Sequence, residues 1–214
     1  MPKLQLLPRH EYRGVNEDDP IRLYYSLFFG PLYRRRVEMC LEECTGGEKI
    51  LEVGFGTGLS FLNLQSMYKQ IHGIDLTADI SQVREVFAAH NIHPDLRTGN
   101  VTQLPYGDGM FDTVLLVSIL EHLKPAEQGN AFSEIKRVLK PGGQVVYGVP
   151  VERFLMVTAF RLLGVNIREQ HFSTEKDVEW AARDTGFETV RLRNLRAFGF
   201  GPLVYQVGHF RKPA

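Results

Sequence analysis

Between residues 50 and 150 the sequence alternates short apolar runs with amphipathic stretches, and no other feature constrains the fold as strongly. Strands covered on both faces give continuous apolar runs, whereas helices that cover a sheet repeat their apolar residues every three to four positions. This alternation is typical of βαβ units, in which a parallel sheet carries helices on its faces. Residues 114–117 are all apolar, so we expect the run at residues 111–118 to be a central strand.

The individual elements follow from the same patterns. Strands are predicted at residues 50–53, 71–76, 95–99, 111–118 and 144–149, and helices at residues 57–70, 80–87 and 132–139. Either Thr77 or Asp79 should cap the second helix, because a side-chain oxygen there can accept a hydrogen bond from the first turn. Pro141 cannot continue the third helix and the glycines after it can take a positive φ, so that helix should end before them.

Beyond residue 150 the pattern changes. Helices are predicted at residues 154–165 and 175–185, the second closed by Gly186, and strands at residues 189–195 and 203–210. A glycine-containing loop at residues 199–202 can join these two strands as antiparallel neighbours without a crossover helix. We therefore expect an α/β domain at residues 47–214 whose parallel sheet ends in an antiparallel hairpin, preceded by a helical lid at residues 1–46.

Composition excludes several classes of protein. The 214 residues are 43% hydrophobic, which allows a sizeable core and excludes fibrous and disordered classes. Lys and Arg total 25 against 25 Asp and Glu, so no net field attracts nucleic acid or anionic lipid. Residues 190–214 hold five basic side chains and no acid, which form either a local patch or only a solvated strand face. No apolar run would span a bilayer and no secretion signal is recognisable, so we expect a cytoplasmic chain. Cys40 and Cys44 are expected to be reduced thiols in the core or at an interface.

A glycine-rich loop, GFGTG at residues 54–58, stands where the first strand becomes a helix. Ligands bind at this position in open α/β sheets, and glycines let the backbone approach them closely. Asp75 ends the second strand, where a carboxylate can accept both hydroxyls of a ribose. The GxGxxG form would need a glycine at Leu59, and no Gly-Lys-Ser/Thr triplet of a P-loop occurs. The loop therefore suits a nucleoside that carries no pyrophosphate.

Five motifs occur in a fixed order: ILEVGFGTG at residues 50–58, GIDL at 73–76, GNVTQLPY at 99–106, FDTVLLVSILEHL at 111–123 and LKPGG at 139–143. Together they resemble the motifs of Rossmann-like (class I) S-adenosylmethionine-dependent methyltransferases of the type 11 small-molecule group. The resemblance implies a doubly wound, mostly parallel seven-stranded sheet of order 3-2-1-4-5-7-6. It also implies S-adenosylmethionine as the cofactor, and methyl transfer by in-line displacement to a small organic acceptor.

The resemblance further implies which residues contact the methionine part of the cofactor. The glycine loop would pass beneath it, with contacts from Gly54, Phe55, Gly56 and Gly58. Glu52 would steer the ammonium group, and Ser118 would meet the same group through its backbone. Tyr24, in an aromatic segment at residues 24–32, would bind the carboxylate, or else this segment only packs a lid helix on the sheet.

On the nucleoside side the resemblance implies four contacts. Asp75 would accept the ribose hydroxyls, and Leu76 would lie against the adenine. Asn100 would accept a hydrogen bond from the exocyclic amine, and the Val101 backbone N–H would bind a ring nitrogen. Many relatives carry aspartate where this chain has Asn100, and an amide oxygen still accepts that bond. We therefore expect weaker adenine binding at this position.

A hydroxyl acceptor would benefit from a general base, whereas an amine, thiol or activated carbon would not need one. The base candidates are Glu121, His122 and His171. His122 directly follows the fourth strand and is the catalytic candidate; the other interpretation is that Glu121 and His122 form a pocket wall and a helix start. No spaced carboxylate cluster indicates a metal ion.

Acceptor recognition should come from segments outside the motifs, the first 46 residues and residues 151–170. Both are rich in large apolar side chains, which suit an apolar or amphiphilic small molecule or simply close the core. Two other functions stay open: a non-catalytic S-adenosylmethionine-binding regulator or partner subunit, and a nicotinamide-dependent oxidoreductase. Leu59 and the antiparallel ending of the sheet argue against the second of these. A homodimer is an open option for the assembly.

Overall fold

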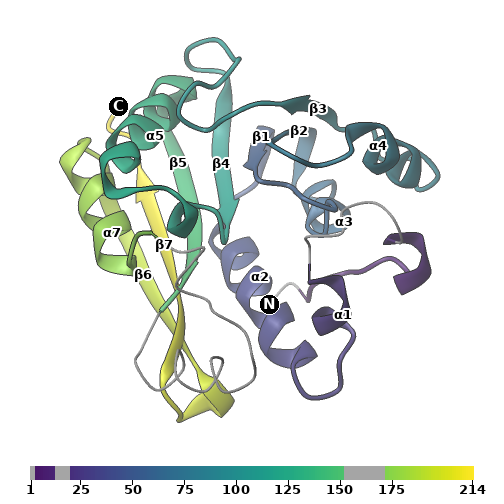
Figure 1. The fold of residues 1–214 in the computed structure, drawn as a ribbon. Coiled ribbons are helices and arrows are strands. Elements are labelled where there is room, and N and C mark those ends of the chain that lie inside the picture. Colours follow the sequence, from purple (N-terminus) through teal and green to yellow (C-terminus); the bar gives the residue numbers. More distant parts are fainter. Residues whose placement is uncertain (1–2, 13–19, 152–171) are drawn as a thin grey trace.

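The computed structural model describes residues 3–12, 20–151 and 172–214, which form a seven-stranded sheet with helices on both faces (Figure 1). The strands are β1 (Gly47–Val53), β2 (Tyr68–Asp75), β3 (Asp95–Thr98), β4 (Phe111–Val117), β5 (Leu139–Pro150), β6 (Glu188–Arg196) and β7 (Leu203–Arg211). Their order is β3-β2-β1-β4-β5-β7-β6, which confirms the expected order. β1 to β5 are parallel, whereas β7 is antiparallel to both β5 and β6. The carboxyl ends of the parallel strands therefore meet at one edge of the sheet.

The helices form two layers, one on each face of the sheet. α2 (Gly30–Glu43), α3 (Phe61–Leu64) and α4 (Ile80–Ala88) cover one face, and α5 (Pro125–Val138) and α7 (Glu175–Asp184) cover the other (Figure 1). Short helical turns occur at η1 (Arg9–Tyr12), α1 (Ile21–Tyr24), η2 (Leu120–His122) and η4 (Ala197–Gly199). Successive strand residues point to opposite faces, so Ile50 packs with the first layer and Leu51 with the second. Each face thus has its own buried core.

The helix predicted at residues 57–70 is wrong in its length. Only Phe61–Leu64 is helical, and β2 already begins at Tyr68. Tyr68 pairs with Gly47 of β1, and its hydroxyl lies 2.8 Å from Thr113 Oγ1 in β4, so this part of the chain is held in the sheet. The positive φ of Gly58, 75°, also delays the start of the helix.

Most of the other predicted elements are confirmed. Asp79 caps α4 by accepting a hydrogen bond from Gln82 N at 3.1 Å, and Gly186 follows α7 with a φ of 79°. Cys40 and Cys44 are buried free thiols. The helix predicted at residues 154–165 lies outside the described residues. Within the described part of the chain, no helix is long and apolar enough to cross a membrane.

An ionic network joins the end of α2 to the β6–β7 hairpin. The Glu43 carboxylate is buried, with one oxygen 3.1 Å from Arg193 Nη1 and the other 3.2 Å from His209 Nδ1. Arg193 also donates to Glu42 at 2.7 Å. Burial lowers the pKa of His209, although Glu43 opposes that shift. The network therefore ties the first long helix to strands that lie at the other end of the sequence.

Candidate functional site

The glycine loop follows β1 at the carboxyl edge of the sheet. Gly54, Gly56 and Gly58 all have positive φ, at 71°, 53° and 75°. Only glycine adopts this region routinely, because a Cβ there crowds the following carbonyl oxygen. A Cβ on Gly54 would also lie 1.9 Å from Ile119 Cδ1. The glycine at position 54 therefore lets the end of β1 pack closely against the chain that leaves β4.

Asp75 stands at the end of β2, and its carboxylate holds the glycine loop in place. Oδ2 accepts a hydrogen bond from Gly56 N at 2.9 Å, and Oδ1 accepts from Thr77 N at 2.9 Å and Ala78 N at 3.0 Å. A carboxylate has about four acceptor positions, so these three donors leave about one for a ligand. Asp75 can therefore accept one ribose hydroxyl as it stands, and two only by releasing a backbone donor such as Gly56 N–H.

The residues assigned to adenine lie along the same edge. Leu76 is 65% exposed, so its side chain is open to a flat ring. Gly99 N donates to Asp75 O at 3.0 Å, which places the Asn100 turn beside the end of β2. Asn100 Oδ1 accepts from Thr102 N at 3.0 Å, and this local bond fixes which amide atom is the oxygen. The buried Val101 side chain anchors the same turn in the core.

Two of the assigned side chains are buried beneath the loop. Glu52 is buried and accepts a hydrogen bond from the Ser60 hydroxyl. Phe55 is buried against Phe61, with 6.0 Å between the ring centroids. In this conformation both side chains support the loop from within the protein. Any contact of Phe55 with a ligand is therefore expected to come from its backbone.

A second cluster gathers where β4 ends, around a side chain that no motif includes. Arg36 of α2 donates a hydrogen bond to Ser118 Oγ, which lies 2.9 Å from the Tyr205 hydroxyl. The Arg36 guanidinium carbon lies 4.4 Å from the ring centroid of Tyr205 and 5.0 Å from that of Tyr33. Aromatic rings attract cations over their faces. Ser118 has a φ of 58°, rare for a residue with a side chain, and these contacts help to hold it there.

Arg36 is a half-buried charge at the carboxyl edge. Burial lowers its pKa, but the tyrosines around it and Glu121 outweigh burial, so the pKa lies above its usual value and the guanidinium stays charged. Arg36 Nε is buried without a hydrogen-bond partner among the described residues. A buried donor left without a partner is unfavourable, and an anion would satisfy it. Tyr24, also buried, packs 5.5 Å from Tyr33 and so belongs to the same cluster.

Sequence reasoning missed Arg36 and Tyr205. A signal for Arg36 was available, because residues four apart share a helix face and Arg36 stands four positions before the buried Cys40. That spacing indicates a shared buried face only if the segment is a helix that covers the sheet. Tyr205 gave no signal of its own, since its contact with Arg36 depends on how the terminal hairpin joins the sheet.

The base candidates lie in different settings. Glu121 is buried, and its backbone oxygen accepts hydrogen bonds from Phe172 N at 2.8 Å and Ser173 N at 3.2 Å. His122 is exposed in η2, directly after β4. His171 and the apolar segment at residues 152–170 lie outside the described residues. The geometry thus places His122 at the carboxyl edge and leaves its role in proton transfer a prediction.

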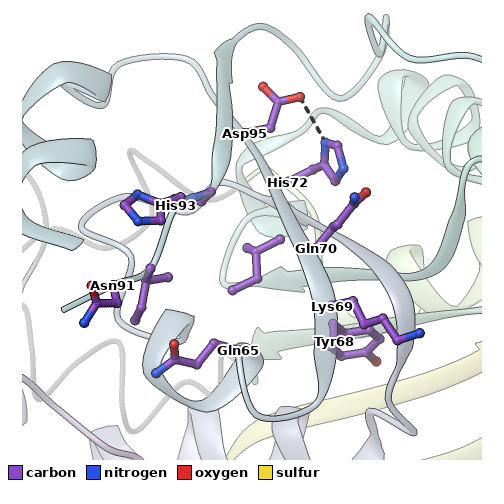
Figure 2. A pocket seen from close by; sticks show the side chains of 11 residues that line it. Gln65, Tyr68, Lys69, Gln70, His72, Asn91, His93 and Asp95 are labelled. Carbon is purple, nitrogen blue, oxygen red and sulfur yellow. Dashed lines mark ion pairs between the residues drawn. The ribbon is translucent and has the colours of Figure 1, made fainter. Parts of the chain in front are cut away.

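A separate pocket of about 450 Å³ lies away from this edge, where β2 and β3 begin (Figure 2). Polar side chains from these strand ends line it, among them Gln65, Lys69, Gln70, His72, Asn91, His93 and Asp95. His72 Nδ1 lies 3.2 Å from Asp95 Oδ2, and burial lowers the pKa of His72 although Asp95 opposes this. None of the residues assigned above lines this pocket.

Within the described ranges, no group of three His, Cys, Asp or Glu side chains could hold a metal ion.

Comparisons with known proteins point to one family. Residues 51–147 match the family described as a methyltransferase domain. A demethylmenaquinone methyltransferase of Beutenbergia cavernae is 33% identical over 155 residues, which cover 68% of this chain and 61% of that protein. The chain therefore spans less than two thirds of the length of that relative.

Two solved structures share the fold. The N-methyltransferase NodS of Bradyrhizobium japonicum, in complex with S-adenosyl-L-homocysteine, matches with a TM-score of 0.67 at 18% identity, over 96% of this chain and 98% of NodS. The [4+2]-cyclase SpnF matches with a TM-score of 0.70 at 20% identity, over 94% of this chain and 86% of SpnF. At such identities the likeness concerns the fold alone.

Proposed function

The chain belongs to the class I S-adenosylmethionine-dependent methyltransferases, and we propose from this premise that it transfers a methyl group from S-adenosylmethionine to a small apolar or amphiphilic acceptor by in-line displacement. The observation that carries the proposal is the glycine loop, whose three positive-φ glycines are tied to Asp75 through Gly56 N–H. This loop presents backbone to a ligand at the edge where open α/β sheets bind theirs.

The residues present fit both ends of this cofactor. Asp75 offers an oxygen to a ribose hydroxyl, and the exposed Leu76 beside it offers an apolar surface to adenine. At the other end, the half-buried Arg36 keeps an unused N–H donor at its buried Nε. We propose that Arg36, with Tyr24 beside it, binds the carboxylate of the methionine part. Charge-assisted hydrogen bonds of this kind are about twice as strong as neutral ones.

S-adenosylmethionine supplies an electrophilic methyl group on a sulfonium centre when it is bound. The chain contributes alignment and shielding from water, which can supply up to about 7 to 11 kcal/mol in well-oriented reactions. We propose that Asp75 and Arg36 fix the two ends of the bound molecule, and that the glycine loop sets its height above the sheet. Glu52 and Ser118 are proposed to orient the ammonium group, Glu52 by charge and Ser118 through its backbone.

Acceptor recognition is proposed to involve the end of β4 together with residues 1–46 and 151–170, most of the latter outside the described residues. We propose that His122, which is exposed in η2, accepts a proton if the acceptor is a hydroxyl. A demethylmenaquinone is the named substrate of the relative from Beutenbergia cavernae, and an apolar or amphiphilic acceptor for this chain agrees with that. The cytoplasmic location and the homodimer stay predictions from the sequence.

Two experiments test the proposed function. Isothermal titration should show that S-adenosylmethionine and S-adenosylhomocysteine bind and that NAD does not. A screen with radiolabelled S-adenosylmethionine against fractionated metabolite extracts should then label an acceptor. Cofactor binding without labelling of any fraction would favour a silent cofactor-binding regulator or subunit instead, and tight NAD binding would favour an oxidoreductase.

A further inference from the structure

Large apolar side chains are exposed mainly at one end of the molecule. Among the described residues, eight of them are exposed, and only Trp180 and Val190 lie on the outer face of a helix or in a strand. The other six lie around the carboxyl edge of the sheet: Leu27, Phe28, Phe29, Leu76, Phe172 and Phe200. Leu76 and Phe172 adjoin the candidate site, whereas Leu27, Phe28 and Phe200 are 86% to 92% exposed and stand on two projecting turns. Both turns are at the lower end of the view in Figure 1.

The first turn, residues 25–29, joins α1 to α2 and has a fixed backbone. Gly30 N donates to Ser26 O at 2.9 Å, and Phe29 N donates to Ser26 Oγ at 3.3 Å. A Cβ on Gly30 would lie 2.9 Å from Tyr24 O, so the chain folds back closely on α1. Leu27 and Phe28 therefore project from an ordered turn.

The second turn, residues 197–202, closes the β6–β7 hairpin beyond the end of β5. Gly201 N donates to Ala197 O at 2.7 Å, and Ala197 N donates to Pro202 O at 2.9 Å. Phe200 sits at the tip of this turn, 89% exposed. Two ordered turns, far apart in the sequence, thus present bulky apolar groups on the same side of the protein.

One exposed arginine accompanies each turn. The other basic side chains nearby in the sequence are engaged or distant: Arg35 pairs with Glu42, Arg193 pairs with Glu42 and Glu43, and Arg211 lies at the opposite end of β7 from the second turn. Arg22 beside the first turn and Arg196 beside the second are exposed, and neither forms an ion pair with a described residue. Residues 17–19 are acidic and lie outside the described residues. Binding to charged vesicles measures the combined effect of the acidic and basic groups. Apolar tips flanked by arginine suit an anionic lipid surface, where aromatic groups enter the headgroup region and arginine stays at the phosphates.

We propose that the two turns dock the protein onto the surface of a bilayer that contains anionic lipid. The docking face lies at the carboxyl edge, so the candidate site faces the lipid. An acceptor dissolved in the bilayer would then reach the site without crossing water. Docking itself is independent of the proposed methyl transfer, and it can be tested without cofactor or acceptor.

The test is flotation of the full chain with vesicles of phosphatidylcholine alone and of phosphatidylcholine mixed with phosphatidylglycerol. The unaltered chain should float with the mixed vesicles, and raised salt should weaken the binding. The double variant Leu27→Ser/Phe28→Ser should bind at least about tenfold more weakly, because it removes the apolar groups that insert. Trp180→Ser is the matched control, since it removes an exposed aromatic group from α7 and should bind like the unaltered chain.

Other outcomes overturn the proposal. Absence of binding to both kinds of vesicle excludes a lipid surface, as does equal binding by the double variant. If the double variant instead converts a dimer into a monomer on size-exclusion chromatography, and vesicles never bind, the face joins two copies of this chain. Circular dichroism of each variant checks folding, and the exposed positions of Leu27 and Phe28 predict no change.

Discussion

The two halves of the candidate site are built in different ways. At β1 and β2 the site is made by backbone, since three glycines with positive φ and one carboxylate lie within residues 54–75. At the end of β4 it is made by side chains, since Arg36, Ser118 and Tyr205 come from three distant segments. The first half is specified by local sequence, whereas the second exists only when the whole sheet is assembled.

This contrast implies different sensitivities to substitution. The half at β1 and β2, where the glycine loop would pass beneath the methionine part and Asp75 would hold the ribose, should fail when its backbone is changed, and the loss should apply to any ligand that carries adenosine. The half at the end of β4 should fail when the Arg36 guanidinium is changed, and the loss should apply only to ligands that carry a carboxylate. Pairs of ligands can therefore separate the two halves.

The largest effect is expected for Gly56→Val. A β-branched residue is strained at a φ of 53°, and the change would disturb the Gly56–Asp75 hydrogen bond. Titration calorimetry should detect no binding of S-adenosylmethionine, while the far-ultraviolet circular dichroism stays intact. Gly109→Val is the matched control, because Gly109 has a φ of 63°, open space around it and a place away from the site. Retained binding in Gly56→Val would mean that the loop is only a turn.

A smaller effect is expected for Asp75→Ala. Loss of a charged acceptor should weaken binding by about 1.5 to 3 kcal/mol. S-adenosylhomocysteine and 5′-methylthioadenosine should lose equally, because both carry the ribose. Asp79→Ala is the control, since it removes a carboxylate that caps α4 and should lower stability by about 1 kcal/mol without changing affinity. Unchanged affinity in a folded Asp75→Ala variant would remove Asp75 from the site.

Arg36→Lys should act on the other half. Lysine keeps the charge but lacks the planar fork, so S-adenosylhomocysteine should bind about tenfold more weakly, a loss of about 1.4 kcal/mol. Binding of 5′-methylthioadenosine, which has no carboxylate, should not change. Arg35→Lys, in the partly buried pair with Glu42, is the neighbouring control. Equal losses for both ligands would show that Arg36 acts through the fold and does not bind the carboxylate.

The smallest effect concerns pH and the network that supports the second half. Burial lowers the pKa of His209 below the ordinary value of about 6.5 that it has when unfolded. As the pH falls, His209 therefore takes up a proton at a higher pH in the unfolded chain than in the folded chain. Its contribution to the free energy of unfolding is fully present above about pH 6.5 and declines below that pH. Urea unfolding at a series of pH values should show a flatter decline for His209→Gln. An unaltered slope in His209→Gln would contradict the assignment.

The same contrast explains what the sequence revealed. The strands and the glycine loop were predicted because each depends on a contiguous motif whose geometry is local, whereas the strand order was predicted only from the resemblance of those motifs to a known family. The helix at residues 57–70 was wrong because pairing of Tyr68 with β1 outweighs the helical spacing of the apolar residues before it. Tertiary contact decides such short segments, whatever their propensity.

Arg36 shows the limit of sequence reasoning most clearly. Its contact with Tyr205 joins residues 169 positions apart by their numbers in the sequence, and no local pattern connects them. The carboxylate of Asp75 shows a subtler limit. Its place at the end of β2 was predictable, but the three backbone donors that already occupy it follow only from the turn after β2.

The link between α2 and the β6–β7 hairpin has a consequence during synthesis of the protein. A growing chain makes the glycine loop and β2 early, whereas Arg36 and Glu43, although made even earlier, must wait for Tyr205, Arg193 and His209 to leave the ribosome. The order of synthesis therefore separates the two halves of the candidate site in time: the contacts of α2 with the hairpin are the last to become available.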